Sequence, residues 1–154
     1  MLPDILVQMS RILVIDDEEG VRMAVKRRLE REGHDVSVAG TTADAVNSIR
    51  NDAPYDVIVT DMSMDVPKSG LEILQAAFSR DLFAEVIVMT AYGNVANAVE
   101  SMRRGAFDYI EKNAPGMDAY EQIALKVEEA LDRRLRDLRT VELWERTAKA
   151  TERV

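Results

Sequence analysis

The stretch that decides the fold is Arg11-Ile12-Leu13-Val14-Ile15-Asp16-Asp17, in which an apolar run typical of a buried strand ends at two aspartates. A second apolar run, Val57-Ile58-Val59-Thr60, ends in the same way at Asp61. Parallel strands of an open sheet bring their carboxyl ends to one edge, and ligands bind there where the order of the chain reverses. We therefore expect Asp16, Asp17 and Asp61 to lie close together.

Three neighbouring carboxylates need compensation for their charge. Two of them about 4 Å apart repel by roughly 4 kcal/mol at an effective dielectric near 20, so the cluster must share protons or hold a cation. Mg²⁺ is the expected cation, because the available ligands are hard oxygens, the chain has no cysteine, and the single histidine, His34, lies in a turn elsewhere. Strand-end aspartates also cap the helices that follow them, and for any one of the three this interpretation stays open.

Apolar segments alternate with amphipathic segments five times along the chain. The expected strands cover residues 11–15, 36–39, 57–60, 85–90 and 106–110, and the expected helices cover residues 18–32, 41–50, 71–78, 94–104 and 118 onwards. This order predicts an α/β fold, a doubly wound parallel sheet with helices on both faces. Thr90 ends the fourth strand and Lys112 follows the fifth, so a hydroxyl and an ammonium should join the aspartates. Alone, such a threonine is ordinarily structural and such a lysine a solvated charge.

Length and composition limit the remaining possibilities. The 154 residues, 47% hydrophobic and 31% charged, describe one domain with a core and leave no room for a second one. No apolar run approaches the roughly 20 residues of a membrane span, the N-terminus lacks a signal-peptide pattern, and cysteine is absent, so we expect a cytoplasmic protein without disulfides. The net charge of -8 argues against direct contact with nucleic acid and favours protein partners.

The last part of the chain predicts one long helix, because no glycine or proline follows Gly116. Thirty residues would span about 45 Å, against a body roughly 35 Å across, so the helix must project. Its apolar positions, at spacings of three and four, are Ala124, Val127, Leu131, Leu135, Leu138 and Val141. The projecting half needs a partner, either a twin helix in a homodimer or the following part of a longer protein. Trp144 would anchor that contact or cover the domain's own surface.

Four stretches carry a family resemblance: residues 12–18, residues 56–61 with Met64 and Gly70, residues 88–91, and residues 105–112. In this combination residues 11–131 resemble a bacterial two-component response-regulator receiver domain. Residues 90–93 and 105–109 are further similar to receivers of the nitrogen-regulator type, which precede ATPase and DNA-binding domains and so imply transcription regulation. The resemblance implies a flavodoxin-like strand order, 2-1-3-4-5. We divide the chain into an N-terminal extension (1–9), the receiver (10–131) and a helical extension (132–154), a linker or dimerisation helix.

The resemblance also implies a role for each candidate residue. Asp61 would accept a phosphoryl group from a sensor histidine kinase. Asp17 and Asp61 would bind Mg²⁺ directly, Asp16 would hold it through water, and the main-chain carbonyl of Ser63 would complete the protein ligands. Lys112 would neutralise charge during the transfer, which depends on positioning and electrostatics.

The same resemblance implies a switch. Thr90 would hydrogen-bond the new phosphoryl group, and Tyr109 would turn inward beside it, past the small Ala91. The altered surface would act on a downstream output domain or protein. By spacing alone, Tyr109 is more simply a core or surface aromatic residue. Such a module is a phosphoacceptor with slow self-dephosphorylation and is not a multiple-turnover enzyme.

The chain departs from the family pattern at two places. Receivers have glycine eight residues after the acceptor, whereas Gly70 is nine residues after Asp61, so one residue is inserted in the loop. Asp65 or Lys68 in that loop would alter the local field or belong to a solvated turn. The family also has Lys-Pro with a cis bond where this chain has Lys112-Asn113. We expect a trans bond here, since a cis bond before a residue other than proline costs about 2.5–4 kcal/mol.

Two other functions are compatible with an acidic strand edge. One is a Mg²⁺-dependent phosphohydrolase with an aspartyl nucleophile. That class has the motif Asp-x-Asp at its first strand, whereas this chain has the adjacent pair Asp16-Asp17 there. The other is an interaction scaffold that is never phosphorylated. The presence of all five residues of the family site argues against it: Asp16, Asp17, Asp61, Thr90 and Lys112. The cognate kinase, its stimulus and any continuation beyond Val154 cannot be deduced from the residues.

Overall fold

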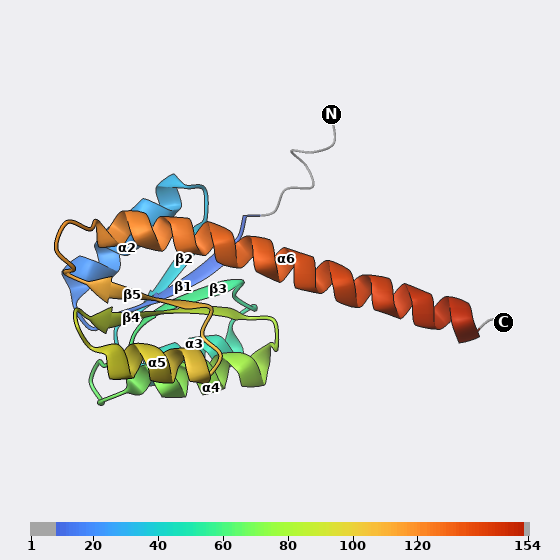
Figure 1. The fold of residues 1–154 in the computed structure, drawn as a ribbon, viewed down its shortest axis with the longest axis horizontal. Coiled ribbons are helices and arrows are strands. Elements are labelled where there is room, and N and C mark those ends of the chain that lie inside the picture. Colours follow the sequence, from blue (N-terminus) through green and yellow to red (C-terminus); the bar gives the residue numbers. More distant parts are fainter. Residues whose placement is uncertain (1–8, 153–154) are drawn as a thin grey trace.

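Five strands form a single parallel sheet in the computed structural model, which describes residues 9–152 (Figure 1). The strands are β1 (Arg11–Ile15), β2 (Asp35–Ala39), β3 (Val57–Asp61), β4 (Glu85–Ala91) and β5 (Asp108–Lys112). Their order is β2-β1-β3-β4-β5, and every neighbouring pair is parallel. The predicted sheet and its strand order are thus confirmed. The expected N-terminal extension lies outside the described residues, except for Met9.

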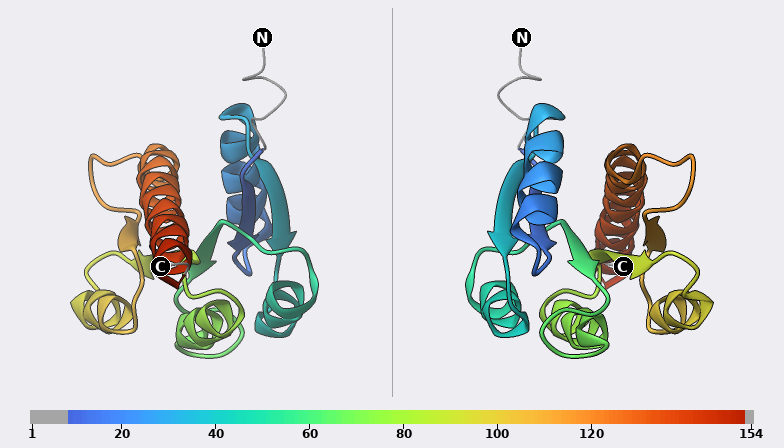
Figure 2. Two further views of the ribbon diagram at one scale, coloured as in Figure 1. Left: turned by 90° about the vertical axis from the view of Figure 1, so that its right-hand side faces the viewer. Right: turned by 90° about the vertical axis from the view of Figure 1, so that its left-hand side faces the viewer.

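Helices cover both faces of the sheet, as a doubly wound fold requires. They are α2 (Glu19–Arg31), α3 (Thr42–Asn51), α4 (Ser69–Arg80), α5 (Val95–Arg103) and α6 (Ala119–Glu152). Figure 2 shows α2 and α6 on one face and α3, α4 and α5 on the other. Alternate side chains of each strand point to opposite faces, so Leu13 and Ile15 join one buried cluster while Ile12 and Val14 join the other.

Local contacts decide two element boundaries that the sequence left open. Thr41, and not Thr42, caps α3, because its hydroxyl accepts a hydrogen bond from the amide of Asp44 at 3.1 Å. The fifth strand begins at Asp108, two residues later than predicted. The amide of Ala106 donates to the carbonyl of Ser101 and closes the turn after α5, so Ala106 belongs to this turn and not to β5.

The first half of α6 packs on the sheet, and the second half projects beyond the body (Figure 1). Ionic contacts join α6 to the body at the point where the helix leaves it. Arg133 contacts Glu85 at 2.7 Å, and Arg134 contacts Asp56 and Asp81, both at 3.0 Å. Beyond them Trp144 is 72% exposed, so it does not cover the domain's own surface. Within residues 9–152, no helix is both long enough and apolar enough to cross a membrane.

Gly70 lets the start of α4 pack against the backbone that follows Asp61. A Cβ at this position would lie 3.0 Å from the Cα of Met62 and 3.2 Å from the carbonyl oxygen of Asp61. We expect Gly70→Ala to lower the free energy of unfolding by about 1–3 kcal/mol, because backbone must move to accept the methyl group. Urea titration measures the change.

A matched control is Gly20→Ala, since Gly20 is also the second residue of its helix but a Cβ there meets nothing within 4 Å. This variant should keep or raise the free energy of unfolding, by about 0.5–1 kcal/mol, because alanine favours the helix. Equal losses in the two variants would show that close packing at Gly70 is not the cause.

Candidate functional site

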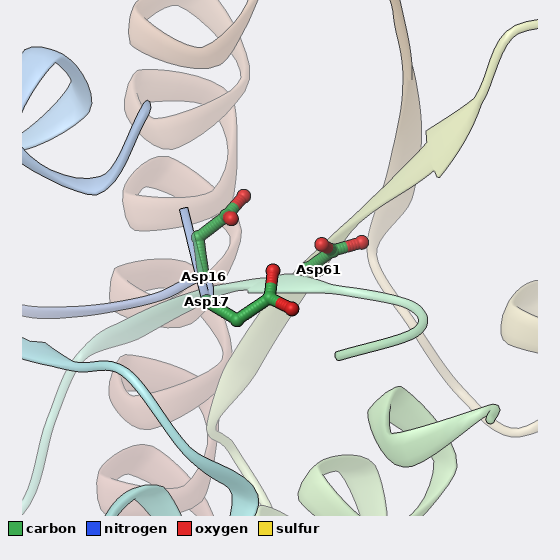
Figure 3. A group of neighbouring side chains, drawn as sticks. All are labelled: Asp16, Asp17 and Asp61. Carbon is green, nitrogen blue, oxygen red and sulfur yellow. The ribbon is translucent and has the colours of Figure 1, made fainter. Parts of the chain in front are cut away.

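Three carboxylates meet at the carboxyl end of the sheet. Asp16 and Asp17 follow β1, Asp61 is the last residue of β3, and one ligand oxygen from each lies within 4.8 Å of the other two (Figure 3). These strands are neighbours at the point where the chain order reverses. Asp16 is fully buried and Asp61 is 8% exposed, whereas Asp17 is exposed to solvent. The structure therefore brings together the three aspartates that the strand ends indicate.

Lys112 supplies positive charge to this cluster. Its ammonium Nζ lies 2.8 Å from Oδ2 of Asp16 and 3.0 Å from Oδ2 of Asp61. The bridge is a third means of charge compensation, besides proton sharing and a bound metal ion. Local sequence patterns miss this bridge, because β4 separates β5 from β3 in the sheet.

The pKa values of Asp61 and Lys112 depend on two opposing effects, the burial of each group and the charge of its partners. Burial raises the pKa of the Asp61 carboxyl above its usual range, the Asp16 carboxylate raises it further, and Lys112 and the amide of Ser63 oppose this. Burial alone would lower the pKa of the Lys112 ammonium, but its two carboxylate partners outweigh burial and the pKa is raised. The ammonium thus stays protonated while it bridges the two carboxylates.

Asn113 does not displace Lys112 from the cluster. Residues 9–152 contain no cis peptide bond, so the expected trans bond before Asn113 is confirmed. Asn113 has a φ of 59°, a left-handed backbone conformation that asparagine adopts more readily than most residues. This turn follows directly after Lys112, whose ammonium still contacts both carboxylates.

Thr90 and Tyr109 lie on the two strands beyond β3. Thr90 is fully buried, and its hydroxyl oxygen Oγ1 has no hydrogen-bond partner among the described residues. A buried polar group without a partner costs roughly 1–3 kcal/mol, so this hydroxyl is suited to donate to a ligand oxygen. Tyr109 pairs with Val88 in the sheet and is 37% exposed, so its ring is turned toward the surface.

The loop between β3 and α4 contains the inserted residue and is ordered by hydrogen bonds. The amide of Ser63 donates to Oδ1 of Asp61 at 3.3 Å, and the hydroxyl of Ser63 accepts from the amide of Lys68 at 3.2 Å. A turn closes the loop, with the amide of Ser69 donating to the carbonyl of Val66 and Lys68 at a φ of 57°. Asp65 is exposed but bonded to Thr42, so it does more than belong to a solvated turn.

The donor set fits a hard divalent cation. All three clustered side chains offer carboxylate oxygens, the ligands that Mg²⁺ prefers, and no cysteine competes for softer metals. The main-chain carbonyl of Ser63 lies two residues beyond Asp61, in the loop that the side chain of Asp61 orders. With the ammonium and the buried hydroxyl nearby, the site can hold a cation beside an oxyanion.

The chain is similar to known regulators in sequence and in structure. A family model described as "Response regulator receiver domain" matches residues 12–124. The photosynthetic apparatus regulatory protein RegA of Rhodobacter capsulatus is 29% identical over 117 residues, which cover 76% of this chain and 62% of RegA. An NtrX-like response regulator of Rickettsia conorii is 32% identical over 102 residues, which cover 66% of this chain and 21% of that protein. The chain thus spans less than two thirds of either relative.

A solved receiver has the same fold. The crystal structure of the receiver domain of NtrX from Brucella abortus is 31% identical in sequence and superposes with a TM-score of 0.69. The match covers 79% of this chain and 98% of the NtrX chain.

Mg²⁺ should stabilise the folded chain, because only folding assembles the three carboxylates. At a Mg²⁺ concentration about 100 times the dissociation constant, the free energy of unfolding should rise by about 2.7 kcal/mol. Urea titrations in MgCl₂ and in NaCl of equal ionic strength measure the difference. Asp17→Asn should lose most of this response, and Asp44→Asn, at an exposed position of α3, should keep it. Equal stability of the unaltered chain in both salts would exclude the cation site.

Proposed function

Because the chain belongs to the response-regulator receiver family of two-component systems, with NtrX-like regulators among its relatives, we propose that Asp61 accepts a phosphoryl group from a sensor histidine kinase. The observation that carries the proposal is the set of contacts around Asp61. Its carboxylate lies beside those of Asp16 and Asp17 and accepts a hydrogen bond from Lys112. An oxyanion formed there would lie beside both the candidate cation site and the Lys112 ammonium.

In the proposed transfer, one carboxylate oxygen of Asp61 attacks the phosphorus of the kinase's phosphohistidine. The new P–O bond forms as the P–N bond breaks, and the histidine, protonated on its other ring nitrogen, leaves as neutral imidazole. Asp17, Asp61 and the main-chain carbonyl of Ser63 would hold Mg²⁺ directly, and Asp16 would hold it through water. Bound Mg²⁺ supplies charge neutralisation for the phosphoryl oxygens, and the Lys112 ammonium does so from the side of β5.

Phosphorylation would then change the surface formed by α5, β5 and α6. It replaces the single carboxylate charge of Asp61 with a phosphoryl group that carries a charge of about -1.5 to -2. The buried hydroxyl of Thr90, which has no partner among the described residues, would donate to a phosphoryl oxygen. Its movement would leave space into which Tyr109, now 37% exposed, turns. We further propose that this surface acts in the cytoplasm on an output domain or protein that regulates transcription.

A small phosphodonor tests the acceptor directly. Incubation with acetyl phosphate and Mg²⁺ should add about 80 Da, one phosphoryl group, to the intact mass. Asp61→Asn should abolish the adduct, and the exposed Asp44→Asn should retain it. One adduct per chain, with phosphate released no faster than the slow loss of that adduct, supports a receiver. Continued release of phosphate from phosphate esters would instead identify a phosphohydrolase, and no adduct with any donor, including a histidine kinase, would identify a scaffold.

We also propose that residues 10–131 form the receiver and that residues 132–154 join it to another protein segment. Beyond Arg134 the apolar face of α6 consists of Leu135, Leu138 and Val141, which are 48%, 39% and 37% exposed. At about 100° per residue, Leu135 and Val141 lie about 60° to either side of Leu138, so the three form one seam. Glu145 continues that face, so the apolar seam spans about two turns.

The seam has two candidate partners, a twin α6 in a homodimer or the following part of a longer protein. Stable coiled coils need about three to four heptads, so we expect residues 1–154 alone to be monomeric at micromolar concentration. Light scattering coupled to size-exclusion chromatography measures the mass. A dimer that Leu138→Glu dissociates would favour the twin helix. Leu143→Glu is the control, because Leu143 is 64% exposed and lies about 140° from Leu138.

A further inference from the structure

The side chain of Asp65 joins the β3–α4 loop to α3 by hydrogen bonds. Oδ1 of Asp65 accepts hydrogen bonds from the hydroxyl of Thr42 at 2.6 Å and from its amide at 3.3 Å. Among residues 9–152, these are the only hydrogen bonds that join residues 63–68 to an element other than β3 and α4. The remaining hydrogen bonds of the loop are internal, or they reach Asp61 of β3 or the first residues of α4. Asp65 therefore supplies the hydrogen bonds between this loop and α3, in addition to the packing of Met64 against the core.

Thr42 is a fixed point in the fold. It is the first residue of α3 and is 5% exposed, and the helix behind it buries Ala45, Val46 and Ile49 against the sheet. The amides at the start of a helix lack partners within the helix, and a carboxylate is favourable there. The hydrogen bond from the Thr42 side chain is the main reason why the pKa of Asp65 lies below its usual range. The tie thus joins an ionised carboxylate to a rigid helix end.

We propose that Asp65 is a positioning residue, which through Thr42 holds the loop so that the main-chain carbonyl of Ser63 can bind Mg²⁺. The inference rests on the proposed function of the site. In the sequence, Ser63 lies midway between Asp61 and Asp65. The carboxylate of Asp61 accepts a hydrogen bond from the amide of Ser63, and the carboxylate of Asp65 accepts one from Thr42 of α3. The insertion lengthens this loop by one residue, and the tie removes the freedom that the extra residue adds.

The consequence is a specific effect on metal affinity. Without the tie, the segment from Ser63 to Lys68 keeps the packing of Met64 against the core but loses its hydrogen bonds to α3. The direction of the Ser63 carbonyl is then less well fixed. Loss of a contact that orients a metal ligand typically weakens metal binding about 10-fold or more. Asp65→Ala should therefore raise the Mg²⁺ dissociation constant about 10-fold. It should also speed hydrogen exchange of the loop amides in the metal-free chain.

Charge alone provides a different explanation, and conservative variants distinguish the two. Thr42→Val removes the hydroxyl donor and leaves the charge of Asp65, whereas Asp65→Asn removes the charge and leaves an acceptor for Thr42. If Asp65 acts by positioning, Thr42→Val should weaken Mg²⁺ binding nearly as much as Asp65→Ala. Asp65→Asn should bind Mg²⁺ nearly as tightly as the unaltered chain. Positioning also predicts no further loss in the double variant Thr42→Val/Asp65→Ala. A pure charge effect predicts that Asp65→Asn equals Asp65→Ala and that Thr42→Val binds like the unaltered chain.

Isothermal titration calorimetry with MgCl₂ on residues 1–154 tests this set of variants. Asp44→Ala is the matched control, since Asp44 is an exposed acid in the first turn of the same helix and should leave the dissociation constant unchanged. Urea unfolding of each variant separates a loss of affinity from a loss of the fold.

The outcomes also separate this inference from the proposed function. An unaltered chain that binds Mg²⁺ and forms the Asp61 adduct, with unchanged affinity in Asp65→Ala and Thr42→Val, overturns the positioning role alone. An unaltered chain that neither binds Mg²⁺ nor forms the adduct overturns both.

Discussion

Lys112 lies on β5, two strands away from Asp61 on β3 and three away from Asp16 after β1, and its ammonium joins these strand ends. The ammonium offsets the repulsion between two buried carboxylates that lie close together. The bridge therefore allows β1 and β3 to end in acids at a buried edge. A cation or phosphoryl group that enters the site meets charges that are already paired, so binding must redistribute contacts. That redistribution would be the physical basis of the proposed switch.

The site combines two kinds of support. Asp16, Asp61, Thr90 and Lys112 are held at the ends of strands whose backbones are fixed by the sheet. Ser63 instead belongs to a loop with one residue more than the family pattern, and its orientation rests on side-chain hydrogen bonds. A close contact between Gly70 and the backbone of Met62 fixes where α4 starts, and Asp65 fixes the middle of the loop against α3. Precision in the loop thus comes from individual contacts, whereas at the strand ends it comes from the whole sheet.

Much of the fold could be predicted because its signals are local. Apolar runs such as residues 11–15 indicate buried strands, and the alternation of strands with amphipathic helices leads to a parallel sheet. The start of β5 was predicted too early because Ala106 is apolar like a strand residue, while its amide bonds to the end of α5. The choice between Thr41 and Thr42 as the cap was open for a similar reason. Both hydroxyls suit the cap, and Thr42 instead bonds to Asp65, 23 residues away.

The sequence by itself determined which chemical groups stand at the strand ends, because a residue's place in a strand follows from the pattern of its neighbours. It thereby determined an acidic, oxygen-rich edge with a hydroxyl and an ammonium. Only the tertiary structure decided how these groups are paired. Lys112 contacts Asp16, 96 residues away in the sequence, and Asp61, 51 residues away. The hydroxyl of Thr90 is left without a hydrogen-bond partner among the described residues. Such contacts depend on packing between distant segments, and no local pattern records them.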